Sequence, residues 1–226
     1  MKFLIDDANI DIIKDIYEYY PIDGVTTNPT ILAKSGGTPY KVLKEIREFI
    51  GEGAELHVQV ISRDTEGIVA EGKKIVEELG QNTYVKIPLI PEGLKAIKIL
   101  TAQGYKVTAT SIYTPLQAYL AAKAGAHYAA PYVNRIDNLG VNGIASVKIM
   151  QDIIDKNGLK TKLLAASFKN SQQIQELCEY GIGAATVGSD VIYNLIRNAY
   201  VEDAVDAFIE DFEGICGKGK TMLDCE

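Results

Sequence analysis

Short β-favouring runs alternate with amphipathic, charged segments along the whole chain, and this alternation limits the possible folds more than any other feature. Alternating strands and helices predict parallel βαβ units. Eight such units within 226 residues predict an α/β fold, a single closed (β/α)8 (TIM) barrel with one extra C-terminal helix. An open, doubly wound sheet is the alternative. No G-x-G-x-x-G follows the first strand, which disfavours a nucleotide-binding Rossmann domain.

The predicted elements follow one another without a linker, repeat or low-complexity segment. The expected strands are Lys2–Ile5, Gly24–Thr27, Leu56–Ile61, Tyr84–Pro88, Lys106–Thr110, Ala126–Tyr132, Lys162–Ala166 and Ala184–Val187. The expected helices are Asn9–Tyr19, Pro39–Ile50, Asp64–Leu79, Pro91–Gln103, Thr114–Ala124, Ile144–Lys156, Ser171–Tyr180, Ser189–Arg197 and Val201–Glu213. Residues 1–226 are therefore expected to form one barrel domain, with a C-terminal oligomerisation helix at about 201–213 and a flexible tail at 214–226.

Composition excludes several classes of partner. The formal net charge of -7 argues against a nucleic acid or a membrane surface, both of which favour a basic face. No apolar run approaches the roughly 18 residues of a membrane span. The segment Met1–Asp7 lacks the apolar core of a signal peptide. We therefore expect a cytoplasmic protein.

Cysteine and histidine do not predict a metal site. Cys178, Cys216 and Cys225 lack metal-ligand spacing, and their odd number does not suggest a disulfide framework. His57 and His127 are too few to bind a metal without further ligands, and His57 is expected on the third strand as a core or pocket-wall residue.

One motif in the tail is discounted. Gly214–Thr221 matches the P-loop pattern G-x-x-x-x-G-K-T. That mechanism requires a strand before the loop and a helix after it, whereas here a helix is predicted before the loop and only five residues follow. We therefore expect no ATP site.

Polar side chains stand at the carboxyl ends of seven successive predicted strands, where barrel enzymes carry their chemistry. They are Asp6, Thr26 with Asn28, Gln59, Lys86, Thr110, Tyr132 with Arg135, and Ser167. Lys86 differs most from its surroundings, because Thr83–Leu89 is otherwise apolar and β-favouring. Burial disfavours the charged form of a lysine, and a neutral amine is the nucleophile of Schiff-base enzymes. The alternative is that Lys86 extends its amine to water from a strand end.

Motifs on five different strands add a resemblance. In this order along the chain they resemble the small transaldolase family, and within it the fructose-6-phosphate aldolases, from residue 2 to about residue 212. The motifs are Asp6, Gly24–Thr30, Val85–Pro88 with Glu92–Leu94, Ala130–Asp137 and Ala165–Phe168.

The resemblance implies a class I aldolase that needs neither a metal nor another cofactor. Lys86 corresponds to the Schiff-base lysine, which attacks the ketone carbon of a ketose. Tyr132 matches the tyrosine that performs acid–base work in the aldolase branch. Gln59 and Thr110 match residues that hold a water molecule beside that tyrosine.

The resemblance also implies a substrate pocket around these groups. Asp6 and Asn28 match groups that bind the sugar hydroxyls near the bond to be cleaved, and Asn28 also steadies the lysine. Arg135 and Ser167 match the phosphate site, and Thr26 lines the pocket. The expected partner is a small-molecule sugar phosphate or dihydroxyacetone.

Two positions favour the aldolase branch. Transaldolases usually carry glutamate at the position of Gln59 and phenylalanine at that of Tyr132. Glutamine orients water but does not exchange protons, so proton transfer is expected to fall to Tyr132. The expected reaction is reversible cleavage of fructose 6-phosphate, or a close ketose relative, to dihydroxyacetone and glyceraldehyde 3-phosphate. The alternatives are a transaldolase and a non-catalytic barrel that binds a sugar phosphate.

The resemblance further implies a homo-oligomer, a ring of five subunits or a stack of two such rings, in which the last helix docks on a neighbour. Val201–Glu213 is the candidate helix, with an apolar stripe that includes Val205 and Phe208. Three departures from the family are visible. Thr186–Asp190 lacks the proline expected before the helix that follows it, Thr110–Ile112 differs from the family's usual run, and Gly214–Glu226 is unlike the family.

Overall fold

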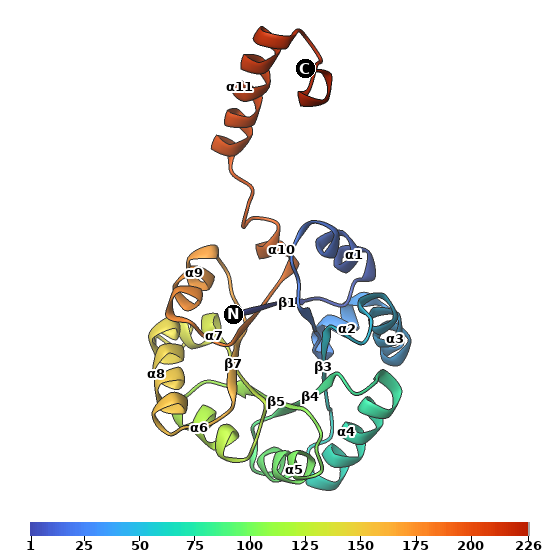
Figure 1. Cartoon of the computed structure of the whole chain (residues 1–226). Helices are drawn as coiled ribbons and strands as arrows, with labels where there is room; N and C mark the ends of the chain where they lie inside the picture. The colour runs from blue at the N-terminus through green and yellow to red at the C-terminus, as the bar shows by residue number, and fades with distance from the viewer. Residues whose placement is uncertain (226) are drawn as a thin grey trace. The chain divides into compact units, whose positions relative to one another are not determined.

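The computed structural model describes residues 1–225 and confirms the predicted barrel. Eight parallel strands pair in sequence order, and β8 closes the ring against β1. Figure 1 looks into this ring, with the helices arranged around it. The strands are β1 (Lys2–Asp6), β2 (Gly24–Thr26), β3 (Glu55–Gln59), β4 (Thr83–Pro88), β5 (Val107–Ile112), β6 (Tyr128–Pro131), β7 (Lys162–Ala165) and β8 (Ala184–Val187).

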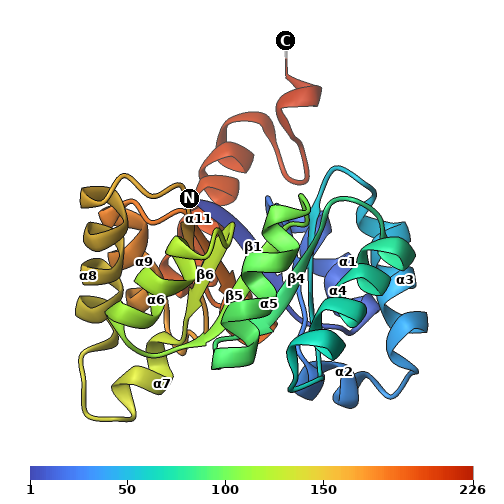
Figure 2. The ribbon, with the colours of Figure 1, turned by 90° about the horizontal axis from the view of Figure 1, so that it is seen from below.

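The chain divides into two compact units, of which Met1–Ile192 holds the barrel and the second begins at Tyr193. The helices of the barrel unit flank the strands in the quarter-turned view of Figure 2. They are α1 (Ile10–Tyr19), α2 (Pro29–Ser35), α3 (Pro39–Ile50), α4 (Thr65–Leu79), α5 (Pro91–Ala102), α6 (Pro115–Lys123), α7 (Val133–Asp137), α8 (Gly143–Lys156), α9 (Ser171–Tyr180) and α10 (Ser189–Ile192).

Two short helices, α2 and α7, were not predicted, and both stand next to the carboxyl ends of strands. For α2 the local signal is clear in retrospect. The Asn28 side chain accepts a hydrogen bond from the Ile31 amide at 3.0 Å, and Pro29 occupies the first turn. Asparagine is a favoured N-cap and proline a favoured first helical residue, so Asn28-Pro29 begins a helix as well as ending a strand.

The second unit contains α11 (Ala199–Cys216) and a single 3-10 turn, η1 (Met222–Asp224). The predicted helix Ser189–Arg197 is too long, because α10 ends at Ile192 and Asn198 caps a new helix by accepting from the Tyr200 amide at 3.0 Å. A helix precedes the P-loop-like segment, as predicted, but α11 continues beyond the predicted end at Glu213 to Cys216, within that segment. Across residues 1–225, no helix has the length and apolar character to cross a bilayer.

A disulfide joins Cys216 to Cys225, which the odd number of cysteines did not lead us to expect. Gly217 follows α11 with a positive φ of 102°, a conformation that glycine adopts without steric penalty. The chain turns there, and the two cysteine Cα atoms lie 6.8 Å apart. The pair is therefore a local closure of the tail rather than part of a disulfide framework.

The amino-terminal end of the barrel interior is closed by a buried polar cluster around Glu55. This carboxylate is 3% exposed and accepts hydrogen bonds from Lys2 at 2.5 Å and from the hydroxyls of Tyr84 and Tyr128 at 3.2 Å each. His57 Nε2 lies 3.4 Å from Glu55. His57 is fully buried in the barrel core, as predicted. Because each polar group has a partner, the cluster closes the barrel without orphaned donors.

This cluster makes the fold sensitive to acid. Burial opposes ionisation of Glu55, but hydrogen bonds from His57 and Lys2 outweigh it and lower the pKa of Glu55 from 4.5 to about 2. Burial lowers the pKa of His57 from 6.5 to about 4, against the opposing effect of Glu55. In both cases the unfolded chain binds the proton more readily, so stability falls as pH falls. The loss begins below about pH 6.5 through His57 and continues from about pH 4.5 towards pH 2 through Glu55.

We therefore expect the melting temperature to be nearly constant from pH 7 to 8 and to fall steadily below about pH 6.5. Glu55→Gln is expected to lower the melting temperature at pH 7 and to flatten its decline below about pH 4.5. Glu78→Gln is the matched control, because Glu78 pairs with Lys44 at the surface. Scanning calorimetry across this pH range tests both variants, and equal acid slopes in Glu55→Gln and wild type would contradict the prediction.

Candidate active site

Eight of the nine predicted site residues line one cavity of about 500 Å³ at the carboxyl ends of the strands. They are Asp6, Asn28, Gln59, Lys86, Thr110, Tyr132, Arg135 and Ser167. The ninth, Thr26, is fully buried and donates a hydrogen bond to Asp6 at 2.6 Å. The structure thus brings residues from seven consecutive strand ends together. Their chemical roles remain predictions.

Lys86 is held inside the barrel by the backbone of a neighbouring strand end. The residue is 6% exposed, and its Nζ donates to the Thr27 carbonyl oxygen at 2.7 Å. Thr27 is itself fixed, because its amide and hydroxyl both donate to the His57 carbonyl oxygen, at 2.9 and 3.1 Å. On its own strand, Lys86 stands opposite Gln59 of β3 and Thr108 of β5. The amine is therefore both desolvated and oriented.

Asp6 shares the cavity with Lys86 and belongs to a chain of hydroxyls. Thr26 gives its single hydroxyl proton to Asp6, so Thr186, 2.6 Å from Thr26, must donate to Thr26 in turn. Burial raises the pKa of Asp6, although the positive charge of Lys86 and the hydrogen bond from Thr26 oppose this rise. A carboxyl group with a raised pKa is better matched to proton exchange near neutral pH.

Tyr132 directs its hydroxyl at Thr110, with 2.8 Å between the two oxygens. The guanidinium carbon of Arg135 lies 4.5 Å from the centre of the Tyr132 ring, a cation–π contact. The turn that carries both residues is joined to the end of β7, because the Asn134 amide donates to the Ser167 carbonyl oxygen at 3.0 Å. Tyr132, the acid–base candidate, and Arg135, the phosphate-binding candidate, therefore lie against each other in the same part of the cavity.

Asn28 caps helix α2 as well as lining the cavity. Its Oδ1 caps α2, while the amine of Lys86 bonds the carbonyl of the preceding residue, Thr27. Asn28 was expected to steady Lys86. In this structure the hydrogen-bond acceptor for the Lys86 amine at this strand end is the backbone carbonyl oxygen of Thr27. Asn28 still presents itself to the same cavity.

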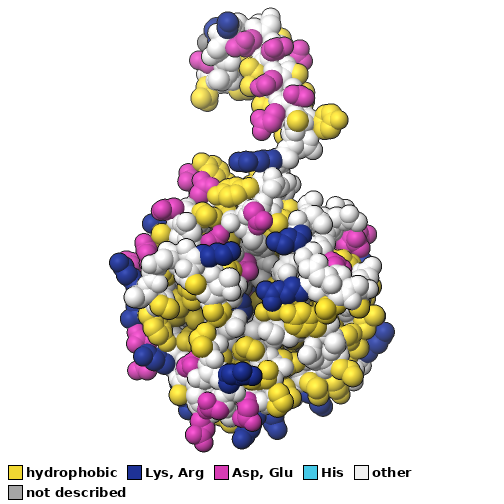
Figure 3. Space-filling view, turned by 180° about the vertical axis from the view of Figure 1, so that it is seen from behind, with side chains coloured by type: hydrophobic (Ala, Val, Ile, Leu, Met, Phe, Trp, Pro, Cys, Tyr) yellow, Lys and Arg dark blue, Asp and Glu magenta, His cyan; other side chains and the backbone are white. Residues whose placement is uncertain are grey.

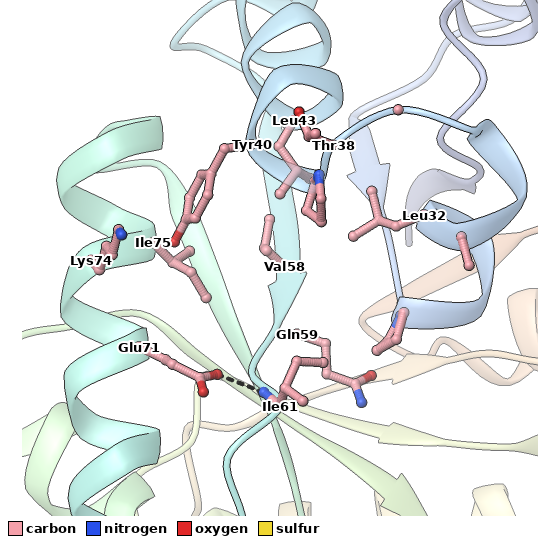
Figure 4. Close-up of a pocket in the computed structure, with 14 residues that line it drawn as sticks. Leu32, Thr38, Tyr40, Leu43, Val58, Gln59, Ile61, Glu71, Lys74 and Ile75 are labelled. Carbon is pink, nitrogen blue, oxygen red and sulfur yellow. Dashed lines mark hydrogen bonds between the residues drawn. The ribbon is translucent and has the colours of Figure 1, made fainter.

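Gln59 borders both the cavity and a second hollow of about 690 Å³ between β3 and helices α2, α3 and α4. Figure 4 shows this largely apolar hollow, walled by side chains such as Leu32 and Tyr40. The Glu71 carboxylate accepts a hydrogen bond from the Ile61 amide at 2.6 Å, drawn as a dashed line in Figure 4. This contact fixes the chain just after Gln59.

Sequence reasoning missed several residues of the site. Thr186 stands near the carboxyl end of β8, so the strand-end pattern of the other seven strands extends to the eighth. Thr27 acts through its backbone carbonyl, which no side-chain pattern reveals. Three charged residues, Lys34, Lys169 and Asp190, also line the cavity.

Donor groups for a metal ion do not converge here or elsewhere in residues 1–225, where no three His, Cys, Asp or Glu side chains cluster suitably. The metal-free mechanism is a prediction that rests on the resemblance and on Lys86.

Comparison with known proteins identifies the family. The pattern of the family described as Transaldolase/Fructose-6-phosphate aldolase matches residues 3–220, and so extends into the tail that we expected to differ. A probable fructose-6-phosphate aldolase of Streptococcus pneumoniae is 41% identical over 94% of this chain and 96% of its own. Probable transaldolases of Hydrogenobaculum sp. and Geotalea daltonii are 38% and 36% identical, over 96% and 95% of this chain and 99% of each relative. The match covers nearly the whole barrel and every strand end that lines the cavity, and the chain belongs to the transaldolase/fructose-6-phosphate aldolase family.

Proposed function

We propose that this protein is a class I aldolase that cleaves fructose 6-phosphate, or a close ketose relative, reversibly to dihydroxyacetone and glyceraldehyde 3-phosphate. The observation that carries the proposal is the pairing of Tyr132 with Thr110 in the cavity that holds the buried amine of Lys86. A phenol in the same cavity as the amine supplies a proton donor, whereas Gln59 only orients water.

The proposed reaction begins when the neutral Lys86 amine attacks the ketose carbonyl carbon. Loss of water leaves an iminium at the ketose C2, which accepts the electron pair of the C3–C4 bond as that bond breaks and so becomes an enamine. The proton of the C4 hydroxyl passes to solvent, the C4–C6 fragment leaves as an aldehyde, and an enamine remains on Lys86. Tyr132 then provides the proton for the enamine carbon, and water hydrolyses the iminium to release dihydroxyacetone and free lysine.

A transaldolase is the alternative within the family, and the names of two of the relatives described above favour it. In a transaldolase the enamine reacts with an aldehyde acceptor instead of taking up a proton. The test is release of glyceraldehyde 3-phosphate from fructose 6-phosphate, with and without erythrose 4-phosphate. Release without the acceptor supports the aldolase, and release that requires the acceptor supports the transaldolase.

A non-catalytic sugar-phosphate-binding barrel is the alternative outside enzymes. Borohydride in the presence of dihydroxyacetone separates it from the proposal, because the reagent reduces an iminium to a stable adduct. A mass increase that maps to Lys86 supports an enzyme, whereas bound ligand without an adduct supports a binder. The expected compartment is the cytoplasm, which cell fractionation would test.

We further propose that the protein is a homo-oligomer assembled through α11. This helix exposes an apolar stripe formed by Val201, Val205, Phe208 and Ile209. Phe208 is 70% exposed. Figure 3 shows hydrophobic and acidic side chains together on the surface of this C-terminal unit, drawn in its upper part. Exposed apolar stripes of this kind are unfavourable in water unless a partner covers them.

Phe208→Glu is accordingly expected to lower the molar mass measured by light scattering, while circular dichroism retains the helical signal. Glu210→Gln, on the same helix, is the control and should keep the wild-type mass. A wild-type protein that runs as a monomer at micromolar concentration would contradict this proposal.

A further inference from the structure

Two buried threonines, one from each neighbour of β1 in the barrel, meet at their hydroxyl groups. Thr26 of β2 is fully buried and Thr186 of β8 is 3% exposed, and their hydroxyl oxygens lie 2.6 Å apart. In the strand register, Asp6 of β1 stands opposite Thr26, and Leu4, two residues earlier on the same strand, stands opposite Thr186. The two threonines therefore link β2 to β8 across the strand that carries Asp6.

The hydrogen bonds of this pair point one after another towards Asp6. A carboxylate only accepts, so the 2.6 Å contact between Thr26 Oγ1 and Asp6 Oδ1 uses the single hydroxyl proton of Thr26. The contact between the threonines then uses the proton of Thr186. A proton on Oδ1 aimed at Thr26 would force both hydroxyls to reverse. In a chain aligned on an anion each hydrogen bond polarises the next, so Thr186 makes Thr26 a stronger donor.

Burial makes this effect large enough to matter. Both threonines lie in the barrel interior, where water does not replace a lost hydrogen bond. A hydrogen bond to an ionised group is about twice as strong as one between neutral groups. Burial raises the pKa of Asp6, and the hydrogen bond from Thr26 opposes that rise. Thr186 therefore acts on Asp6 without touching it.

The charged groups that face Asp6 come from other elements. Lys86 of β4 and Arg135 of α7 favour its ionised form, and the neighbouring carboxylate of Asp7 opposes it. Asp7 Oδ2 accepts a hydrogen bond from the Ser189 hydroxyl at 2.7 Å. The other charged side chains that line the cavity are Lys34, Lys169 and Asp190. These charges stay in place when the Thr186 hydroxyl is removed, so its effect can be measured separately.

We propose that Thr186 is a positioning residue that acts through Thr26 to keep Asp6 ionised and oriented towards a substrate hydroxyl. The proposal rests on the proposed function and on the expected role of Asp6, which binds sugar hydroxyls near the bond that breaks. An ionised carboxylate accepts a hydrogen bond from such a hydroxyl and favours departure of its proton. Cleavage should therefore fall as Asp6 takes up a proton, and loss of the Thr186 hydroxyl should bring that fall to a higher pH.

The experiment measures kcat/KM for fructose 6-phosphate against pH in wild type and Thr186→Val. Valine keeps the β-branched shape and removes the hydroxyl. We expect the acidic limb to move upward by about 0.5 to 1 pH unit, with the plateau changed by less than about threefold. Thr186→Ser restores a hydroxyl and should return the limb to its wild-type position. Substrate ionisation is the same for every variant, so differences between the limbs belong to the protein.

Thr161→Val is the matched control. Thr161 is a buried threonine just before β7, and its hydroxyl donates to the Ala126 carbonyl oxygen at 2.5 Å. The variant loses one buried hydrogen bond, as Thr186→Val does, and should keep the wild-type limb. Circular dichroism at each pH verifies that all variants remain folded. A limb that does not move in Thr186→Val, or that moves equally in Thr161→Val, would overturn the inference.

A double-mutant cycle tests whether Thr186 acts through Thr26. Thr26→Val should move the limb in the same direction, and adding Thr186→Val to it should move the limb no further. Full additivity of the two shifts would contradict the proposal, because Thr186 would then act by another route.

A readout without turnover separates this proposal from the proposed function. Carboxyl-carbon NMR follows the titration of Asp6 directly, with its resonance assigned by comparison with Asp6→Asn, and the midpoint should be higher in Thr186→Val than in wild type. If wild type does not cleave fructose 6-phosphate, the proposed function fails. Equal Asp6 midpoints in wild type and Thr186→Val would refute the role of Thr186 alone.

Discussion

Lys86→Met is expected to lower kcat for fructose 6-phosphate cleavage by at least about 10⁴-fold, because it removes the nucleophile of the proposed reaction. Methionine is an unbranched side chain one heavy atom shorter than lysine and is readily buried, so the barrel should retain its fold. The Thr27 carbonyl oxygen loses the hydrogen bond that Lys86 gives it, which should lower the melting temperature by only a few degrees. Steady-state kinetics and circular dichroism measure the two effects.

Lys95→Met is the matched control, since Lys95 is an exposed lysine on α5, the helix that follows β4. It should keep full activity. Borohydride trapping with dihydroxyacetone adds a chemical readout: wild type and Lys95→Met should gain the mass of the reduced adduct, and Lys86→Met should gain none. Activity within tenfold of wild type in Lys86→Met would show that the cavity performs its chemistry without a Schiff base.

The position of Lys86 was predictable because two independent regularities point to it. The β-then-α rhythm places its segment as the fourth strand, and an isolated lysine in an apolar strand is uncommon. The barrel brings all strand ends to one face, so Asp6 and Tyr132 were placed beside Lys86 without any knowledge of distances. Topology alone brings these side chains to one end of the barrel, whereas the choice of Lys86 as a nucleophile, and of Tyr132 as its acid–base partner, depends on the family resemblance.

Other features depend on backbone geometry, which side-chain patterns do not report. The partner of the Lys86 amine is the Thr27 carbonyl oxygen, and every residue carries a carbonyl. The positive φ of Ser111 and the register shift between Ala109 and Ile112 mark a bulge in β5, yet no residue type in this stretch signals a bulge in the sequence. The Cys216–Cys225 pair depends on the turn at Gly217, because cysteine spacing alone does not determine pairing.

Tyr132→Phe is expected to reduce acceptor-independent cleavage of fructose 6-phosphate by about 10²- to 10³-fold, the usual contribution of one general acid–base group. The substitution removes the hydroxyl that lies 2.8 Å from Thr110 and leaves the ring on which Arg135 packs. Binding of the phosphorylated sugar should therefore persist, with KM changed by less than about threefold. Kinetics on fructose 6-phosphate, with Tyr119→Phe as the matched control, measure the change.

Tyr132→Phe should change the ratio of transfer to cleavage as well as the rate of cleavage. Schiff-base formation needs Lys86, which is intact, so the enamine should still form and persist longer when its proton donor is gone. Erythrose 4-phosphate then competes for the enamine, and the ratio of transfer to cleavage should rise by at least about tenfold. If Tyr132→Phe lowers cleavage and transfer equally, the phenol serves a step common to both reactions, such as iminium formation or hydrolysis. In that case the proton for the enamine has another source, and Asp6, whose pKa burial raises, becomes the first residue to substitute.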